Sequence, residues 1–115
     1  MIESSAHATW TDFERLGIRV GTIRKVELFS EARKPAFKLW IDFGPFGIKR
    51  SSAQITALYK AADLVGRRVI CATGLGSKRV AGFESEVLVT GFVREDQAVV
   101  LAVPDSAVAD GSPLC

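Results

Sequence analysis

Apolar and polar side chains alternate most regularly between residues 36 and 43. The apolar positions that share one face of this segment are Phe37, Leu39, Ile41 and Phe43. Lys38, Trp40 and Asp42 occupy the other face, so the period of two predicts a strand with one buried face and one polar face. Trp40, on the polar face, can stack on a base, pack beneath a neighbouring element or lie in a dimer interface.

Shorter apolar segments predict further strands. A long first strand is expected over residues 18–29, where the alternation changes phase after Gly21. A phase change at a glycine is typical of a β-bulge, so we expect the bulge at Gly21. The remaining predicted strands cover residues 48–52, 69–72, 86–92 and 98–103.

Helical signals are weak in this chain. Thr11 and Glu14 have the spacing of a capping box, which predicts a short helical turn over residues 12–16. Residues 53–59 have helical apolar spacing, and Ser52 stands where an N-cap residue would be.

About six short strands with one or two short helices, and no regular alternation of strands with helices, are typical of a small barrel. We therefore predict an all-β fold, a Greek-key barrel of the oligonucleotide-binding (OB) type. Residues 1–12 are expected to form an N-terminal tail, and residues 13–113 the barrel domain.

The last predicted strand is apolar on both faces, over residues 98–103. A single barrel would leave one of these faces in water, so another surface is expected to cover it. A second copy of the chain would cover it in a homodimer. The alternative is that the C-terminal tail, residues 106–115, covers it within the same chain.

The composition is that of one folded domain: 115 residues, 48% hydrophobic and 24% charged. No apolar segment approaches the roughly 20 residues that cross a bilayer, and the start lacks a signal-peptide pattern, so a cytoplasmic protein without membrane insertion is expected. The net charge is only +2, but residues 15–79 carry fourteen basic side chains against four acidic ones. This excess indicates either a polyanion-binding surface or a solvated surface with distant ion pairs.

Residues for catalysis or metal binding are scarce. The chain has one histidine, His7, and two widely separated cysteines, Cys71 and Cys115, which form neither a zinc-ligand cluster nor a disulfide framework. Nothing supplies a nucleophile together with a base, so we predict a protein that is not an enzyme and needs no cofactor. We expect Cys71 to be buried and Cys115 to be accessible.

The predicted nucleic-acid-binding residues fall in three basic segments and one mixed segment. They are Arg33 and Lys34 in a loop, Lys49, Arg50 and Ser51 in a strand, Lys78 and Arg79 after a glycine-containing loop, and Ser85 with Glu86. Paired cations suit phosphate contacts, and short hydroxyl or carboxylate side chains suit hydrogen bonds to base edges or ion pairs.

Four segments taken in order resemble the tRNA-binding-domain family: residues 18–23, 31–44, 49–56 and 80–92. The second and third also resemble its CsaA-like branch. The resemblance extends over residues 13–113 and implies an OB barrel, a homodimer, tRNA binding, and a chaperone role in protein export. One departure is that Gly74, Leu75, Gly76 and Ser77 stand where the branch usually has Asn-Phe-Pro-Pro, so the loop before Lys78 is expected to be less preorganised.

Two functions follow from this reading. The first is a dimeric module that binds tRNA or another structured RNA through phosphate contacts, largely by shape. The second is a protein-export chaperone that holds extended segments of unfolded preproteins.

Overall fold

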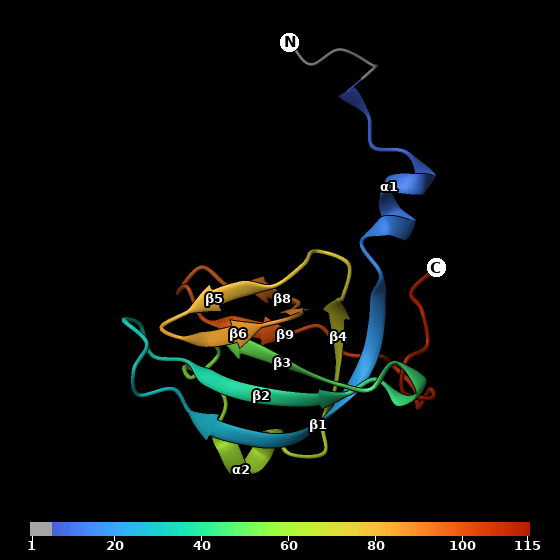
Figure 1. The fold of residues 1–115 in the computed structure, drawn as a ribbon. Coiled ribbons are helices and arrows are strands. Elements are labelled where there is room, and N and C mark those ends of the chain that lie inside the picture. Colours follow the sequence, from blue (N-terminus) through green and yellow to red (C-terminus); the bar gives the residue numbers. More distant parts are fainter. Residues whose placement is uncertain (1–5) are drawn as a thin grey trace.

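A five-stranded antiparallel sheet forms the main part of the computed structural model, which describes residues 6–115. Its strands, in spatial order, are β3 (Ile48–Ala53), β2 (Phe37–Asp42), β1 (Ile18–Leu28), β4 (Arg68–Ala72) and β7 (Leu88–Val89). The sheet curls into a nearly closed barrel (Figure 1). The predicted all-β, OB-type barrel is therefore confirmed.

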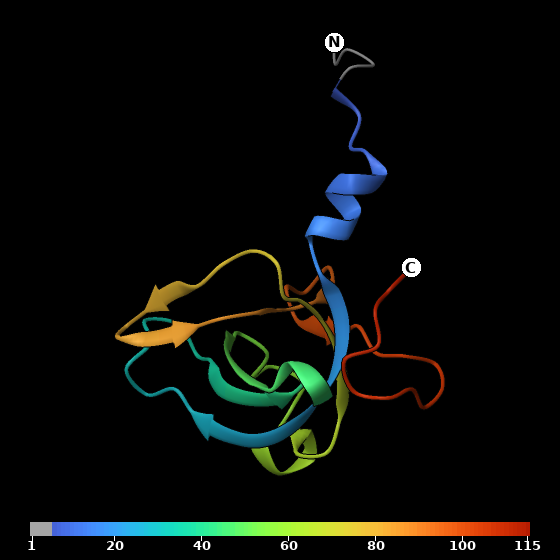
Figure 2. The same ribbon diagram turned by 45° about the vertical axis from the view of Figure 1, so that its right-hand side comes forward.

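Two hairpins and two short helices complete the fold. The hairpins pair β5 (Lys78–Val80) with β6 (Phe83–Ser85), and β8 (Gly91–Val93) with β9 (Val99–Leu101). The helices are α1 (Trp10–Arg15) and α2 (Ala61–Leu64), and a 3-10 turn covers Gly44–Phe46. The β5–β6 hairpin extends along one side of the barrel, as Figure 2 shows. Within residues 6–115, no helix is long and apolar enough to cross a membrane.

The predicted alternation in β2 is confirmed. Four side chains of this segment are buried in the barrel core: Phe37, Leu39, Ile41 and Phe43. Strands β1 and β4 supply further residues of this core, notably Ile23 of β1 and Val69 and Cys71 of β4.

The bulge in β1 is not at Gly21, where it was predicted. The pairing with β2 shifts register between Ile23 and Lys25, which places the irregularity at Arg24. Gly21 is needed for space, because a Cβ there would lie 2.6 Å from Ile41 and 2.8 Å from Phe43. The glycine thus marks a close approach to the core, and the loss of alternation begins three residues later.

Helix α1 begins earlier than predicted. Its N-cap is Thr9, whose hydroxyl oxygen accepts a hydrogen bond from the Asp12 N–H at 3.1 Å, while the Asp12 carboxylate accepts one from the Thr9 N–H at 2.8 Å. The capping box is therefore Thr9 to Asp12, and the prediction of Thr11 to Glu14 was wrong. No residue of α1 is buried, and the helix stands away from the barrel (Figure 1).

The helix predicted over residues 53–59 does not form. Ser52 lies within β3, the chain then crosses the barrel end as a turn, and the helix is α2, a few residues later. The apolar spacing instead reflects packing, since Ile55 is buried and the hydroxyl oxygen of Tyr59 accepts a hydrogen bond from the Leu101 N–H at 3.0 Å.

The single strand predicted over residues 86–92 is divided between two sheets. β7 pairs with β4, whereas β8 pairs with β9. At the bend between them, the Thr90 hydroxyl donates to the Ile70 carbonyl at 2.6 Å. The β5–β6 hairpin was not predicted as such, because its three-residue strands are too short and too polar to show alternation.

The C-terminal segment pairs with the start of β1. The Gly111 N–H donates to the Val20 carbonyl, the Val20 N–H to the Ser112 carbonyl, and the Leu114 N–H to the Ile18 carbonyl. Residues 111–114 of the predicted covering tail thus lie along β1, not along the last strand. Beside β9, the side chains of Phe92 and Val93 in β8 remain 68% and 67% exposed.

Candidate nucleic-acid interface

Two adjoining cavities of about 740 and 620 Å³ lie between the β1–β2 loop, the end of β3 and the β5–β6 hairpin. We call them together the basic cleft. Four residues line both cavities: Arg33, Ser52, Gln54 and Val80. Lys34 lines the smaller cavity, and the larger one is lined by residues 75–80 with Ser85, Val87 and Leu88.

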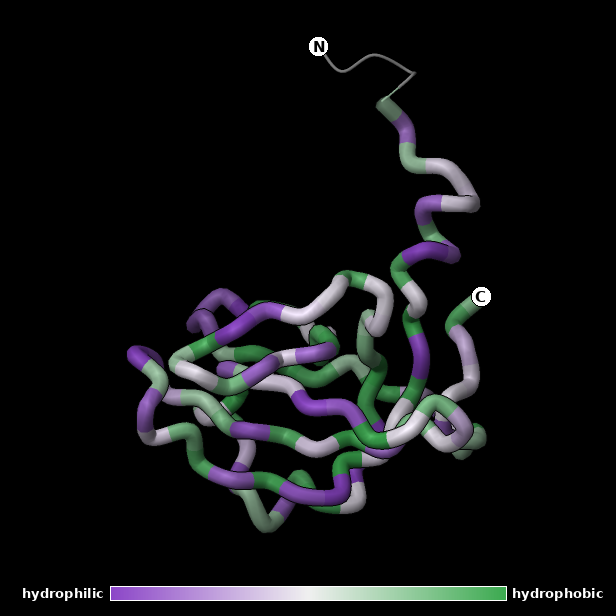
Figure 3. The backbone as a smooth tube through the Cα atoms, in the orientation of Figure 1, coloured by the Kyte–Doolittle hydropathy of each residue, from purple (hydrophilic) through white to green (hydrophobic). Residues whose placement is uncertain are grey.

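Three cations of the basic cleft have no ion pair within residues 6–115: Arg33, Lys34 and Lys78. Arg33 and Lys34 lie in the β1–β2 loop and Lys78 begins β5, so the fold brings together two of the predicted basic segments. Figure 3 shows hydrophilic positions in the β1–β2 loop and in β5. Cations without a local carboxylate remain available for phosphate oxygens.

Arg79 differs from its neighbour Lys78. Its guanidinium lies 3.3 Å from the Glu84 carboxylate across the hairpin and donates to the Gly82 carbonyl at 3.3 Å. The turn that joins the two strands has Ala81 and Gly82 at φ 45° and 82°, the positive values of a two-residue hairpin turn. Arg79 is therefore partly neutralised within its own hairpin.

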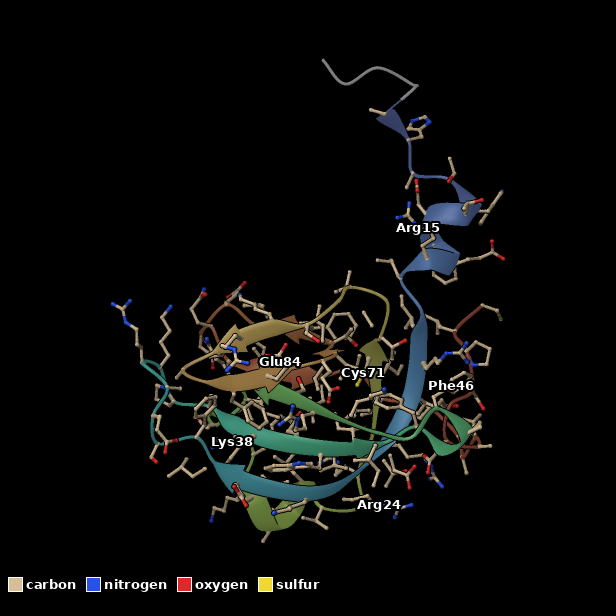
Figure 4. The ribbon with its side chains drawn as sticks, viewed as in Figure 1. Arg15, Arg24, Lys38, Phe46, Cys71 and Glu84 are labelled. Atoms are coloured by element: carbon tan, nitrogen blue, oxygen red, sulfur yellow. The ribbon has the colours of Figure 1, made fainter. Side chains whose placement is uncertain are left out.

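Phe83 anchors this hairpin to the barrel. Its ring lies edge-on to Phe29 and to Trp40, with centroids 5.5 and 5.8 Å apart. The charged ends of Lys38 and Arg50 lie 5.3 and 5.4 Å from the Phe83 ring centroid. Of the three roles considered for Trp40, the structure therefore shows packing beneath a neighbouring element. Figure 4 shows Lys38 of β2 below Glu84 of β6 on this side of the barrel.

Ser85 and Glu86 close the barrel along β3, which is an edge strand of the main sheet. Ser85 Oγ accepts a hydrogen bond from the Ser52 N–H at 3.0 Å, and Glu86 Oε1 accepts one from the Arg50 N–H at 3.0 Å. Glu86 Oε1 also lies 3.5 Å from Arg50 Nε. These side chains take the place of a neighbouring strand, so a structural role accounts for both of them.

The other predicted site residues are dispersed. Ser51 is 0% exposed and faces the core. Arg50 lies over Phe83, and Lys49 lines a separate cavity with Glu86. The structure thus distributes the predicted site residues over the cleft, the core, an outer face and a third cavity.

Leu75 and Leu88 also line the basic cleft and were not predicted as site residues. Their side chains are 54% and 53% exposed. Leu75 belongs to the loop that departs from the usual sequence, and a lone leucine in a loop gives no pattern that would have identified it. The part of the chain that the structure describes contains no group of three or more His, Cys, Asp or Glu side chains that could hold a metal ion.

A small antiparallel barrel with cations gathered beside its β1–β2 loop belongs to the class of OB-type modules. The model of the tRNA binding domain family matches residues 18–113, and the chain belongs to that family.

Within it, the chain is similar to two solved structures of CsaA. The chaperone CsaA of Bacillus anthracis strain Ames is 46% identical, with 96% of this chain and 100% of that one covered and a TM-score of 0.89. The CsaA chaperone of Picrophilus torridus is 43% identical, with 95% and 100% covered and a TM-score of 0.87. The predicted resemblance to the CsaA-like branch is confirmed.

Curated relatives of this chain include methionine–tRNA ligases. The ligase of Methanococcoides burtonii is 28% identical over 104 residues, and ligase 1 of Sorangium cellulosum is 34% identical over 103 residues. These matches cover 90% of this chain but only 15% and 14% of the two ligases. The chain thus corresponds to a small part of these enzymes.

Proposed function

We propose that this chain is a non-catalytic tRNA-binding module that contacts RNA phosphates through the basic cleft and acts as a homodimer. The observation that carries the proposal is the convergence of Arg33, Lys34 and Lys78, all without ion pairs in residues 6–115, on one cleft. Membership of the tRNA binding domain family supports tRNA as the polyanion.

Recognition in the cleft would rest on shape and charge. Of residues 6–115, none that lines the basic cleft is aromatic, so bases lack a stacking platform there. Ser52 and Gln54 line both cavities and offer hydrogen bonds to ribose hydroxyls. The cations then position the backbone, with little discrimination between bases.

Helix α1 supports the homodimer. Trp10 is 88% exposed, and a groove of about 410 Å³ runs between α1 and the C-terminal segment, lined by Phe13, Ile18 and Leu114 among others. An isolated six-residue helix is marginal in water, because helices of this length depend on tertiary packing. A second copy of the chain, with the same apolar groove, would supply that packing symmetrically.

The β8–β9 hairpin is a second apolar surface. Phe92 and Val93 are exposed there, next to the strand whose two apolar faces predicted a dimer. This hairpin is already held by the Tyr59 hydroxyl and by β-pairing, so its stability does not require a partner. We therefore assign the dimer contact to α1 and its groove.

The second candidate function is a protein-export chaperone that binds extended preprotein segments. The exposed Leu75 and Leu88 favour it, since they give the basic cleft an apolar wall. The solved relatives named chaperone CsaA support the same reading. In this case affinity would depend on apolar contacts, and salt would affect it little.

Competition between the two ligand classes tests the proposal. Fluorescently labelled tRNA is titrated at several salt concentrations, with and without an excess of a reduced, unfolded polypeptide. The proposal expects affinity to fall steeply with salt and the polypeptide to compete poorly. Weak salt dependence with efficient displacement by the polypeptide would favour the chaperone instead.

A further inference from the structure

A third cavity, of about 330 Å³, opens at the end of the barrel where β1 begins. We call it the barrel mouth. It is lined by one end of several strands and the loops beside them: Arg19, Phe43, Phe46, Lys49, Thr73 and Glu86, with Gly76, Ser77 and Val87. Figure 4 shows Phe46 at this end of the barrel, opposite the end where Lys38 lies.

Strand alternation brings two cations to this mouth. Lys49 pairs with Ile41, so its side chain projects from the same face as the buried Ile41 and Leu39. Arg19 is two residues from Gly21 and four from Ile23, and therefore shares their core face. Both are half-buried, so each has a long side chain whose charged end lies at the edge of the core.

Arg19 is fixed in position by two contacts. Its guanidinium carbon lies 4.0 Å from the centroid of the Phe46 ring, and its Nη1 donates to the Gly111 carbonyl at 2.8 Å. The remaining guanidinium N–H groups have no partner in the described chain, and the guanidinium plane offers a flat surface on which a ring can stack.

The charge of the mouth is positive. Neither Arg19 nor Lys49 has an ion pair with a carboxylate within residues 6–115. Glu86 contributes a carboxylate to the lining, but its Oε1 is engaged by Arg50. The Thr73 hydroxyl donates to the Gly17 carbonyl at 2.6 Å, which leaves its oxygen as an acceptor for a ligand hydroxyl.

We propose that the barrel mouth binds one nucleoside phosphate. The base stacks on the Arg19 guanidinium beside the Phe46 ring. The phosphate contacts Lys49, and a ribose hydroxyl donates to Thr73 Oγ1. A volume of about 330 Å³ lies in the range of roughly 300–1,000 Å³ for small-molecule sites, and barrel mouths are a preferred location for them.

The nucleoside phosphate has two possible sources, a free nucleotide or the unpaired end of an RNA strand. Gly76, Ser77 and Val87 line both the mouth and the larger cavity of the basic cleft, so the two sites adjoin. This favours the RNA end, and in that form the inference rests on the proposed function. Binding of a free nucleotide at the barrel mouth does not depend on RNA binding in the basic cleft.

The test is an NMR titration of the ¹⁵N-labelled full chain with adenosine monophosphate, adenosine and inorganic phosphate, each in turn. Adenosine monophosphate should shift the amide signals of Phe46, Thr73 and Ser77, while those of Ala81 and Gly82 in the hairpin turn remain in place. Lys49→Gln should weaken this binding about tenfold or more, since it removes a charge-assisted contact. Lys60→Gln, at another cation without an ion pair in residues 6–115, is the matched control.

Other results would overturn the inference. Equal amide-signal shifts with inorganic phosphate and with adenosine monophosphate would show that the site does not contact the base. Unchanged affinity of Phe46→Ala for adenosine monophosphate would show the same. If the shifted signals are confined to the basic cleft, or if no signals shift, the barrel mouth is not a nucleotide site. The proposed function is then tested separately by tRNA binding. Loss of tRNA binding with the mouth still occupied by the nucleotide would reject the proposed function alone.

A second arm distinguishes the two sources. tRNA that lacks its four unpaired 3′ nucleotides is compared with intact tRNA in the wild type and in Lys49→Gln. If an RNA end occupies the mouth, truncation weakens binding to the wild type and has little further effect on the variant. If truncation changes nothing in the wild type, the mouth takes a free nucleotide, and the assignment to an RNA end is wrong.

Discussion

The hydroxyl oxygen of Ser85 accepts a hydrogen bond from the backbone N–H of Ser52 at 3.0 Å. This contact joins the β5–β6 hairpin to the edge of the main sheet, and Ser85→Ala would leave the N–H without its partner. We expect the free energy of unfolding to fall by about 1 kcal/mol, as for an ordinary lost hydrogen bond. Urea unfolding measures it, with Ser30→Ala, at an exposed serine, as the control. Equal stability of the two variants would show that this contact does not help to close the barrel.

Lys78 should carry a phosphate contact of its own. Each contact releases a counterion, so Lys78→Ala should flatten the slope of log affinity for tRNA against log salt by about 0.7 to 0.9. The fold should be unaffected, since Lys78 is exposed. Arg94→Ala is the control, because Arg94 pairs with Asp96 at 2.6 Å in the β8–β9 hairpin. An unchanged slope in Lys78→Ala would remove β5 from the RNA site.

Arg79 should contribute less than Lys78 until its partner is removed. Glu84→Gln eliminates the carboxylate that lies 3.3 Å from the Arg79 guanidinium. We expect this variant to bind tRNA more tightly and with a steeper salt slope, because a freed cation can contact a phosphate. Adding Arg79→Ala should cancel the gain. If Glu84→Gln alone weakens binding, Glu84 itself contacts the RNA.

The mass of the protein in solution tests the dimer. Light scattering at micromolar concentration should give twice the chain mass of 12.4 kDa, and Trp10→Glu should return a monomer with an intact fold. Phe92→Glu, on the β8–β9 hairpin, should remain dimeric.

Cys115 reports on the same contact, because it is exposed and lines the groove beside α1. Its reaction with a thiol reagent should slow as protein concentration rises and the dimer forms. A rate independent of concentration, together with a dimeric Trp10→Glu variant, would place the dimer contact elsewhere.

Cys71 should make stability depend on alkaline pH. Burial raises the pKa of its thiol from 9.0 to about 12. Below pH 9 the thiol is neutral in both the folded and the unfolded chain; between pH 9 and 12 only the unfolded chain loses the proton. The free energy of unfolding should therefore decrease over this range, by on the order of 1 kcal/mol per pH unit. Denaturant unfolding from pH 8 to 10.5 should show a steeper decrease for the wild type than for Cys71→Ala.

Secondary structure was predicted most accurately where burial of one face makes apolar and polar residues alternate regularly. β2 alternates because one face is wholly in the core, and its strand was predicted almost to the residue. The start of α1 was misplaced because the sequence offers two overlapping capping-box spacings, Thr9 to Asp12 and Thr11 to Glu14, of which the structure forms the first. Both satisfy the local chemistry, so local sequence does not decide between them.

The site was harder to predict than the barrel because it depends on long-range packing. Phe83 holds the β5–β6 hairpin against Phe29 and Trp40, and this contact brings Lys78 close to Arg33. In β3, Ser51 and Ser52 are chemically alike, yet the register with β2 buries Ser51 and leaves Ser52 in the cleft lining. A polar strand without apolar alternation gives no sign of which serine points inward.

The pairing of the C-terminal segment with the start of β1 brings both chain ends out of the barrel at one place. The Leu114 N–H donates to the Ile18 carbonyl, whereas residues of the β5–β6 hairpin line the basic cleft. Figure 1 shows this hairpin on the left of the barrel and the C-terminus on the right. A polypeptide fused before Ile18 or after Leu114 would therefore leave the cleft unobstructed. Another domain could therefore be joined to either end of this barrel without changing the residues of the cleft. The similar segment of the methionine–tRNA ligase of Methanococcoides burtonii makes up 15% of that enzyme.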